Sequence, residues 1–447
     1  MRHFACPFLA AVSLLWLAPG APAESRPRYG GTFIVELHAA PNLTDPGEWP
    51  VRLVPLVYDR LVRLDNHGEP QPALAASWQH DASNRHWEFR LRPHILFHDG
   101  SPVTAQAVAA CLKDWVNLEP AGETVIFQSE TPAPDLPLRL AGSRGAILLR
   151  GADGATVGTG PFRITEWQPG KHALLSAFEG YWAGRPFVDF VELRLGRASR
   201  EQAIDLDLGK ADLIEIPVAD VRRAAQQAVR QWTSAPCDLW ALLFDRSHSS
   251  VQDSRLREAI ALSIDRDAIH NVLLQGQGES TGAILPAWLS GYSFLFPPTR
   301  DLDRTRQLAA SVAKPGTRIS LAYDPADSQV RPIADRVVLN AREAGLILQA
   351  VPGAQSAVRL VRLPLRSLDA WEGLAEMSAL LHTGTPPPTT SPEALFAFER
   401  KLLEDFRLVP LFHLPEIYGV SSRVRNWEPQ PWGDWRIDNV WLETRTP

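Results

Sequence analysis

The sequence predicts an α/β protein built from two lobes, and two observations support this. Segments with the apolar pattern of a β-strand alternate with helical patterns along most of the 447 residues, which is typical of α/β domains. About 424 residues would remain after removal of an N-terminal leader, more than one hydrophobic core usually supports. We therefore expect mixed sheets in two lobes that are joined by a hinge.

The N-terminus has the pattern of a secretory signal peptide. Arg2 precedes an apolar run over residues 8–18, and small residues at 21–23 provide a cleavage site. The run is too short to cross a membrane, which takes about 20 helical residues. Cys6 precedes the run instead of lying at the cleavage site, so no lipid anchor is expected. We predict that residues 1–23 are removed and that the mature chain is free in the periplasm.

Charge and cysteine content narrow the classes of function. The chain carries 45 Lys and Arg against 51 Asp and Glu, a net charge of −6. Since the arginines are scattered among acids, nucleic acid is not an expected partner. Cys111 and Cys237 remain after cleavage. Cys111 falls on the apolar face of a helical pattern, so we favour two buried thiols, with one disulfide as the alternative.

The first part of the mature chain has strand and helix signals in a clear order. A buried strand is expected over 32–37, and a half-buried strand over 86–91, where Trp87 and Phe89 share a face. Thr104 is expected to cap the helix that follows. Further strands are expected at 162–164 and 191–195, before a short helix and an apolar strand within 200–217. We expect a small α+β subdomain over about 51–157.

The second part begins with an apolar strand at 239–244, followed by the polar segment 245–252, our candidate for a crossing between lobes. Asp253 and Asp265 are each expected to cap a helix. A βαβ unit is expected over 319–351, then a helix from Pro392 and a strand over 409–414. We expect lobe I to contain residues 24–243 and 415–447, and lobe II residues 244–414.

Several phrases together resemble the family 5 extracellular solute-binding proteins, which include dipeptide, oligopeptide and nickel receptors of ABC importers. The resemblance covers most of the mature chain. The phrases that carry it are Tyr29-Gly30-Gly31-Thr32, Trp87-Glu88-Phe89-Arg90-Leu91-Arg92, Phe97-His98-Asp99-Gly100-Ser101-Pro102-Val103-Thr104-Ala105, Gly158-Thr159-Gly160-Pro161-Phe162, Asp253-Ser254-Arg255-Leu256-Arg257-Glu258-Ala259 and Ala261-Leu262-Ser263-Ile264-Asp265-Arg266. Most of these phrases also have purely structural explanations as turns and helix starts.

The resemblance implies a type II periplasmic-binding fold and a function in ABC import. On this basis the chain is a monomeric receptor that binds a small solute, with a short peptide as the expected ligand, and delivers it to membrane permease subunits. It implies no enzyme activity and no cofactor. The alternative is an exported interaction or sensing protein on the same scaffold. That alternative stays open because the segment that receives the peptide amino group in the family is shorter here, between Val358 and Pro392.

Six residues are candidates for ligand contact. Asp369 beside Trp371 is the nearest equivalent of the acidic residue among aromatics that accepts a peptide ammonium group in the family. Arg362, or alternatively Arg359, is suited to bind a ligand carboxylate. The three further candidates are placed by the resemblance, Leu43 in the loop after the first strand and Trp240 and Phe244 on the strand before the hinge. Each of the six also has a structural interpretation, as a core or surface residue.

Metal binding and catalysis are not predicted. His94 and His98 have the spacing of a helical metal pair, but Pro93 and Gly100 bracket them, and in an extended chain they would lie roughly 13 Å apart. The sequence contains no phosphate-binding Gly-Lys-Ser/Thr loop, and Cys111 falls on a packed face instead of at a nucleophile position.

Overall fold

The computed structural model describes residues 26–40, 49, 51–113, 115, 117–150, 156–312, 317–325, 327, 329–353, 355–365, 367–387, 391–430 and 434–443. The predicted signal peptide and Leu43 lie outside these residues. None of the described helices is long and apolar enough to cross a membrane.

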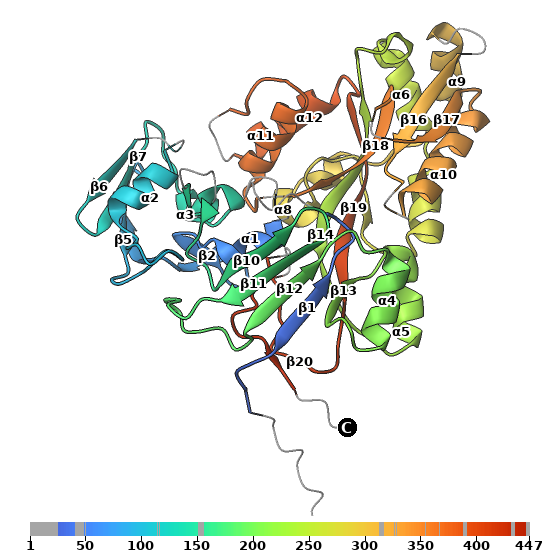
Figure 1. Cartoon of the computed structure of the whole chain (residues 1–447). Helices are drawn as coiled ribbons and strands as arrows, with labels where there is room; N and C mark the ends of the chain where they lie inside the picture. The colour runs from blue at the N-terminus through green and yellow to red at the C-terminus, as the bar shows by residue number, and fades with distance from the viewer. Residues whose placement is uncertain are drawn as a thin grey trace, which may run out of the picture.

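A mixed 11-stranded sheet extends from β10 at one end to β17 at the other and forms the centre of the molecule (Figure 1). Its strands, in spatial order, are β10 (Phe162–Gln168), β11 (His172–Ala177), β12 (Phe190–Arg194), β1 (Thr32–Glu36), β13 (Leu213–Glu215), β19 (Leu408–Val420), β14 (Arg230–Phe244), β18 (Val358–Pro364), β16 (Arg318–Tyr323) and β17 (Ile347–Pro352), with β15 (Glu279–Ser280) paired to β19. β1 is parallel to β12 and β13, and β16 is parallel to β17 and β18, whereas the other pairs are antiparallel. Mixed α/β architecture is therefore confirmed.

Two long neighbouring strands, β14 and β19, connect the lobes. They pair from Arg230 opposite Val420 to Leu243 opposite Leu408, and the register is irregular around Pro236, which lies opposite Pro415. Proline has no N–H, so neither residue can donate to the ladder at this point. The paired prolines therefore weaken the sheet where the chain passes from one lobe to the other.

β14 begins at Arg230 rather than at the predicted Leu239. The difference has a physical reason, because residues 230–233 are only half-buried or exposed and carry no continuous apolar run. Likewise, β19 continues to Val420, beyond the predicted end at Leu414.

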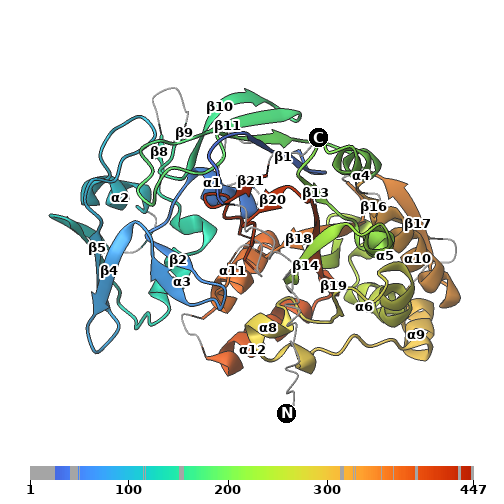
Figure 2. The same cartoon turned by 90° about the horizontal axis from the view of Figure 1, so that it is seen from below.

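A separate four-stranded sheet lies within the range predicted for the α+β subdomain, and we refer to this region as the α+β part. Its order is β4 (Ala75–His80), β5 (His86–Leu91), β7 (Thr124–Gln128) and β6 (Leu118–Ala121), and it lies at the far side of the molecule from β16 and β17 (Figure 2). Trp87 and Phe89 are buried on one face, as predicted. Thr104 caps α2 (Ala105–Cys111), since its hydroxyl accepts a hydrogen bond of 3.2 Å from the Ala107 amide.

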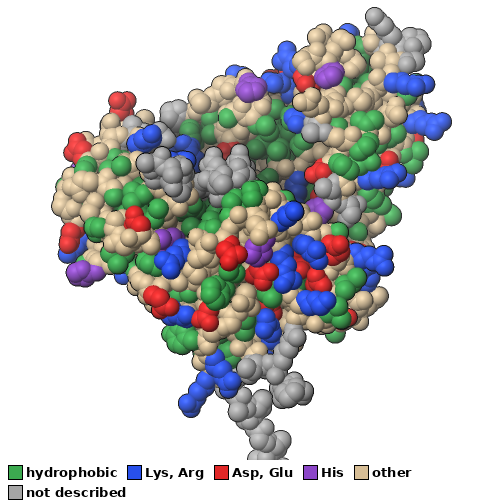
Figure 3. Space-filling model, viewed as in Figure 1, with side chains coloured by type: hydrophobic (Ala, Val, Ile, Leu, Met, Phe, Trp, Pro, Cys, Tyr) green, Lys and Arg blue, Asp and Glu red, His purple; other side chains and the backbone are tan. Residues whose placement is uncertain are grey.

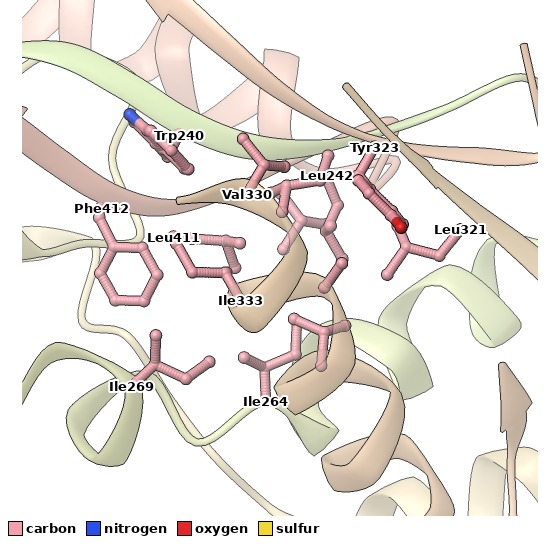
Figure 4. Close-up of a cluster of buried hydrophobic side chains, with 14 of the residues drawn as sticks. Trp240, Leu242, Ile264, Ile269, Leu321, Tyr323, Val330, Ile333, Leu411 and Phe412 are labelled. Carbon is pink, nitrogen blue, oxygen red and sulfur yellow. The ribbon is translucent and has the colours of Figure 1, made fainter. Parts of the chain in front are cut away.

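In lobe II a helix packs against the sheet and encloses an apolar core (Figure 4). Val330 and Ile333 of α10 (Val330–Glu343) belong to the same buried cluster as Leu242 of β14 and Leu321 of β16. The predicted strand, helix and strand over 319–351 are β16, α10 and β17, which confirms the βαβ unit.

The two helix starts predicted at Asp253 and Asp265 are present, but the second helix is shorter than expected. Asp253 caps α6 (Ser254–Ser263), and Asp265 caps α7 (Arg266–Ala268), which continues as a π-helical turn over Ile269–Leu273. Val272, expected on the inner face, is 73% exposed. The wider π-helical turn changes the direction of the side chains after Ala268.

The remaining helices and short strands complete the fold. They are α1 (Val54–Val57), β2 (Val62–Leu64), β3 (Pro70–Pro72), α3 (Leu136–Leu140), β8 (Leu149–Arg150), β9 (Thr156–Val157), α4 (Ser199–Asp207), α5 (Val221–Gln226), α8 (Ala287–Ser290), α9 (Leu302–Val312), α11 (Ala370–Leu380), α12 (Pro392–Leu403), β20 (Val424–Arg425) and β21 (Trp441–Leu442). Among the described residues, Cys111 and Cys237 are free thiols, the arrangement favoured over a disulfide. Cys237 is buried, whereas Cys111, expected to be buried, is half-buried and donates to the Leu148 carbonyl.

Arg257, from the phrase that begins at Asp253, has a structural role. It is 1% exposed and donates to the carbonyl oxygens of Val251, Gln252 and Asp405 at 2.6–2.9 Å. Arg257→Met would leave buried carbonyls without donors. We expect it to lower the free energy of unfolding by about 2–4 kcal/mol, measured by urea denaturation. Arg255→Met, which removes a surface arginine from the same helix, is the control. Equal stability of the two variants would contradict this role.

Candidate binding site between the lobes

A pocket lies where the two lobes meet at the strands that connect them. It contains about 570 Å³ of empty space, part of it continuous with solvent. Residues from β13 and the turn after it line it from lobe I, β14 and β19 contribute its inner wall, and β18 with the segment before α10 lines it from lobe II. Figure 3 shows that this side of the molecule is hollowed between the lobes.

Charged side chains from five separate parts of the chain meet at this pocket. Arg52, in the turn before α1, donates to Glu215 of β13 at 2.6 Å and also to Glu416 of β19. Arg362 of β18 donates to Asp238 of β14, with 2.6 Å between Nε and Oδ2. Arg362 thereby links β18 of lobe II to the connecting strand β14, and Arg52 links lobe I to the connecting strand β19.

Burial makes these ion pairs interdependent. Burial raises the pKa of Asp238, and the adjacent Arg362 opposes that increase. Burial alone would lower the pKa of Arg52, but Glu416, Tyr418 and Glu215 raise it above its usual value. Each buried arginine and its carboxylate partners therefore depend on one another, because removing either one would leave an uncompensated buried charge.

Acidic groups outnumber basic ones around the pocket. Four acids line it, namely Glu215, Asp238, Asp327 and Glu416, whereas Arg362 is the arginine in its lining. Arg52 pairs with two of these acids, so the acids still outnumber the arginines. Within the described part of the chain, Asp327 forms no ion pair. One of its oxygens accepts a hydrogen bond of 2.9 Å from the Gln329 amide, which leaves the other available. A positively charged group would therefore be favoured in this pocket.

His38 and Trp240 add polar and apolar surface to the same pocket. Both ring nitrogens of His38 are buried without a hydrogen-bond partner in the described structure. Trp240 is 2% exposed and belongs also to the apolar core of lobe II. The core and pocket interpretations of Trp240 are thus compatible.

The other predicted contact residues lie elsewhere. Phe244 is buried in the core of lobe II and does not line the pocket. Asp369 and Trp371 also lie outside the pocket lining. Asp369 is the N-cap of α11, where its carboxylate accepts from the Glu372 amide at 2.8 Å. The Trp371 indole donates to the Pro387 carbonyl at 2.7 Å.

Asp369 and Trp371 instead adjoin a contact between α11 and the α+β part of lobe I. Arg139 of α3 donates to Glu372 at 3.3 Å and lies over the Trp371 ring at 5.5 Å. Burial, together with the charges of Asp135 and Glu372, raises the pKa of Asp369 to about 6. Because this pKa is higher than the ordinary value of 3.8, ionisation of Asp369 lowers the stability of the folded protein.

Asp369→Asn should therefore stabilise the protein at high pH. The stabilising effect of the protonated Asp369 is complete below its unfolded pKa near 3.8 and is lost as pH rises through about 6. Asparagine retains the helix cap and cannot ionise. We expect a gain on the order of 2 kcal/mol at pH 8 and little change at pH 4, measured by urea unfolding.

The matched control is the cap of α6, Asp253, because its pKa is lowered by the side chain and amide of Arg255. Asp253→Asn should lose stability at pH 8. If Asp369→Asn shows no gain there, the ionised Asp369 carboxylate is not a cost in the folded state.

Sequence reasoning missed Arg52, Glu215, Glu416 and Asp327. Glu215 lies in the predicted strand segment 200–217, where an acid between apolar residues carries no local sign of its distant partner. Asp327 precedes a helix, and such a residue is normally explained as a cap.

Comparisons with known proteins agree with the architecture. The family model described as bacterial extracellular solute-binding proteins, family 5 Middle, matches residues 69–363. The chain is 24% identical over 369 residues to the probable D,D-dipeptide-binding periplasmic protein DdpA of Escherichia coli, covering 73% of this chain and 71% of that protein.

Solved structures share the fold across almost the whole chain. NikA from Staphylococcus aureus in complex with Ni(L-His)2 has a TM-score of 0.79 at 17% identity, covering 92% of this chain and 100% of NikA. The oligopeptide-binding protein AppA from Bacillus subtilis, in complex with a nonapeptide, has a TM-score of 0.78 at 17% identity, covering 94% and 100%. The two-lobed type II periplasmic-binding fold is thereby confirmed. The chain belongs to the family 5 bacterial extracellular solute-binding proteins, whose members are binding proteins.

Proposed function

We propose that the chain is the substrate-binding receptor of an ABC import system and that it captures a short peptide between its lobes. The observation that carries this proposal is the excess of carboxylates around the pocket between the lobes. A peptide at neutral pH has an ammonium terminus that these groups attract, and relatives named for dipeptide and oligopeptide binding support the same ligand class.

Asp327 is the proposed receiver of the ligand ammonium group. It lines the pocket from lobe II and has no cation within ion-pair distance in the described structure. The other three acids each contact an arginine, so their charge is already largely balanced. Trp240 supplies an apolar wall for a side chain of the ligand.

The proposed mechanism is closure of the lobes around the ligand, as described for periplasmic binding proteins as a class. We place lobe I at 24–243 and 415–447 and lobe II at 244–414. The Val218 amide donates to the Gln329 side chain at 2.8 Å, and Arg139 contacts Glu372 on the other side. A ligand that touches both lobes would favour the closed state, in which these contacts between the lobes form.

The proposal includes export and partners. A signal peptide at 1–23 would direct the chain to the periplasm, where the mature protein acts as a monomer without cofactor or catalysis. The closed form would deliver its ligand to the ABC permease subunits in the membrane.

Native mass spectrometry of the purified mature protein, combined with a thermal-shift screen of di- to pentapeptides, tests the ligand class. We expect a retained or added peptide and an increase in melting temperature. The N-acetylated form of the best peptide lacks the ammonium group and should bind much more weakly. The peptide assignment fails if no peptide binds, or if acetylated and free peptides bind equally.

A further inference from the structure

A second pocket, separate from the one between the lobes, lies inside lobe I. It contains about 570 Å³ of empty space, part of it open to solvent, and it shares no lining residue with the first pocket. Its walls come from the segment after α1, from β2, from the turn at Tyr181 and Trp182, and from the C-terminal segment 434–438. It thus lies between the main sheet of lobe I and the α+β part.

Arg60 is the most unusual side chain of this pocket. It is 7% exposed, and its Nη1 donates to Asp434 at 2.7 Å. Its Nε and Nη2 atoms are buried and have no hydrogen-bond partner among the described residues. In a planar guanidinium these two nitrogens direct their N–H groups along one edge, in the geometry that a carboxylate accepts with both oxygens.

Two further arginines line the same pocket. Arg63, on β2, is half-buried and forms no hydrogen bond or ion pair within the described residues. Burial, and next the charge of Arg436, lower its pKa, so an anion near both would relieve their repulsion. Arg436 has a long contact of 3.4 Å with Asp438.

The charges around the pocket favour a ligand with a single negative charge. Asp434 and Asp438 offset two of the three arginines. Asp59 accepts from the Trp182 indole at 2.6 Å and from the Tyr181 hydroxyl at 3.5 Å. Burial raises the pKa of Asp59 to about 7, so this carboxyl is only partly ionised near neutral pH and offsets only part of the third arginine's charge. A phosphate dianion would meet too many carboxylates, whereas a monocarboxylate would not.

Gln430 indicates that the ligand also carries a donor. It is 4% exposed, and its buried Oε1 has no hydrogen-bond partner in the part of the chain that the structure describes. A hydroxyl group on the ligand would satisfy this acceptor, because a buried polar atom without a partner is unfavourable.

From these contacts we infer that lobe I contains a second binding site, which takes a small hydroxylated monocarboxylate on the free edge of Arg60. The site is independent of the pocket between the lobes. Its occupant completes the hydrogen bonding of Arg60 and links the α+β part to the C-terminal segment.

Saturation-transfer difference NMR with glycolate as the probe tests this site. We expect the mature protein to bind glycolate and not glycolamide, its neutral analogue. Arg60→Met and Arg63→Met should each weaken glycolate binding by at least about tenfold, because each removes a charged donor. Arg90→Met, which removes an arginine with a 70% exposed side chain, and Asp327→Asn in the other pocket should leave it unchanged.

If Arg60→Met fails to fold, Arg63→Met carries the test, since Arg63 has no hydrogen bond or ion pair to a described residue that the substitution would remove. The inference is overturned if glycolate does not bind the folded wild-type protein, if glycolamide binds equally, or if both arginine variants retain full affinity. Tighter binding of inorganic phosphate than of glycolate would overturn the assignment to carboxylates.

Discussion

Arg52→Met is expected to lower the free energy of unfolding by about 3–5 kcal/mol, the largest stability effect that we predict. Arg52 is 8% exposed and pairs with Glu215 and Glu416, whose side chains are 19% and 10% exposed. Methionine replaces the apolar stem of the side chain but removes the guanidinium, which leaves two carboxylates in a poorly solvated site. Urea unfolding at neutral pH measures the loss.

Two further variants make the interpretation specific. Glu416→Gln in the Arg52→Met background removes one uncompensated charge and should restore part of the lost stability. Arg90→Met removes an exposed arginine that lies 3.8 Å from Glu123 and should have little effect. If Arg52→Met is no more destabilising than Arg90→Met, the ion pairs at the pocket contribute no net stabilisation.

Asp327→Asn should weaken the binding of a free peptide by about 10- to 100-fold, because a charge-assisted hydrogen bond contributes about 1.5–3 kcal/mol. Asparagine can still accept from the Gln329 amide, so the free energy of unfolding should change little. Isothermal titration calorimetry with the best peptide from the screen measures the effect.

The acetylated peptide provides an internal check. It has no ammonium group to lose, so its affinity should be similar for Asp327→Asn and the wild-type protein. Asp303→Asn replaces an acid with an 89% exposed side chain on α9 and should bind peptide normally. Equal weakening of both peptides by Asp327→Asn would mean that Asp327 acts on the shape of the pocket and not on the ammonium group.

Much of the fold could be predicted because its signals are local. The alternation around Trp87 and Phe89 and the caps at Thr104 and Asp253 depend on neighbours in the chain, and the structure has each of them. The full length of β14 could not be predicted, since its first half is stabilised by pairing with β19, far away in the sequence. The π-helical turn after Ala268 likewise has no simple sequence signal.

The site was predicted less well because its chemistry is distributed. Arg362 and Trp240 line the pocket, but Arg52, Glu215 and Glu416 come together only after the sheet has formed. Asp369 and Trp371 have the composition of an ammonium site, yet the structure uses them to begin α11 and to contact Pro387. Residue type could therefore nominate candidates, but only the folded structure shows which of them lie together at one pocket.

The central claim, that a solute binds between the lobes and closes them, is tested most directly by a distance measurement. Spin labels would be placed at Glu119→Cys on β6 and Leu380→Cys at the end of α11, two exposed positions in different lobes, in a Cys111→Ser background. Double electron–electron resonance should show a shorter and narrower distance distribution when the peptide is saturating. An unchanged distribution with peptide bound would contradict binding between the lobes with closure.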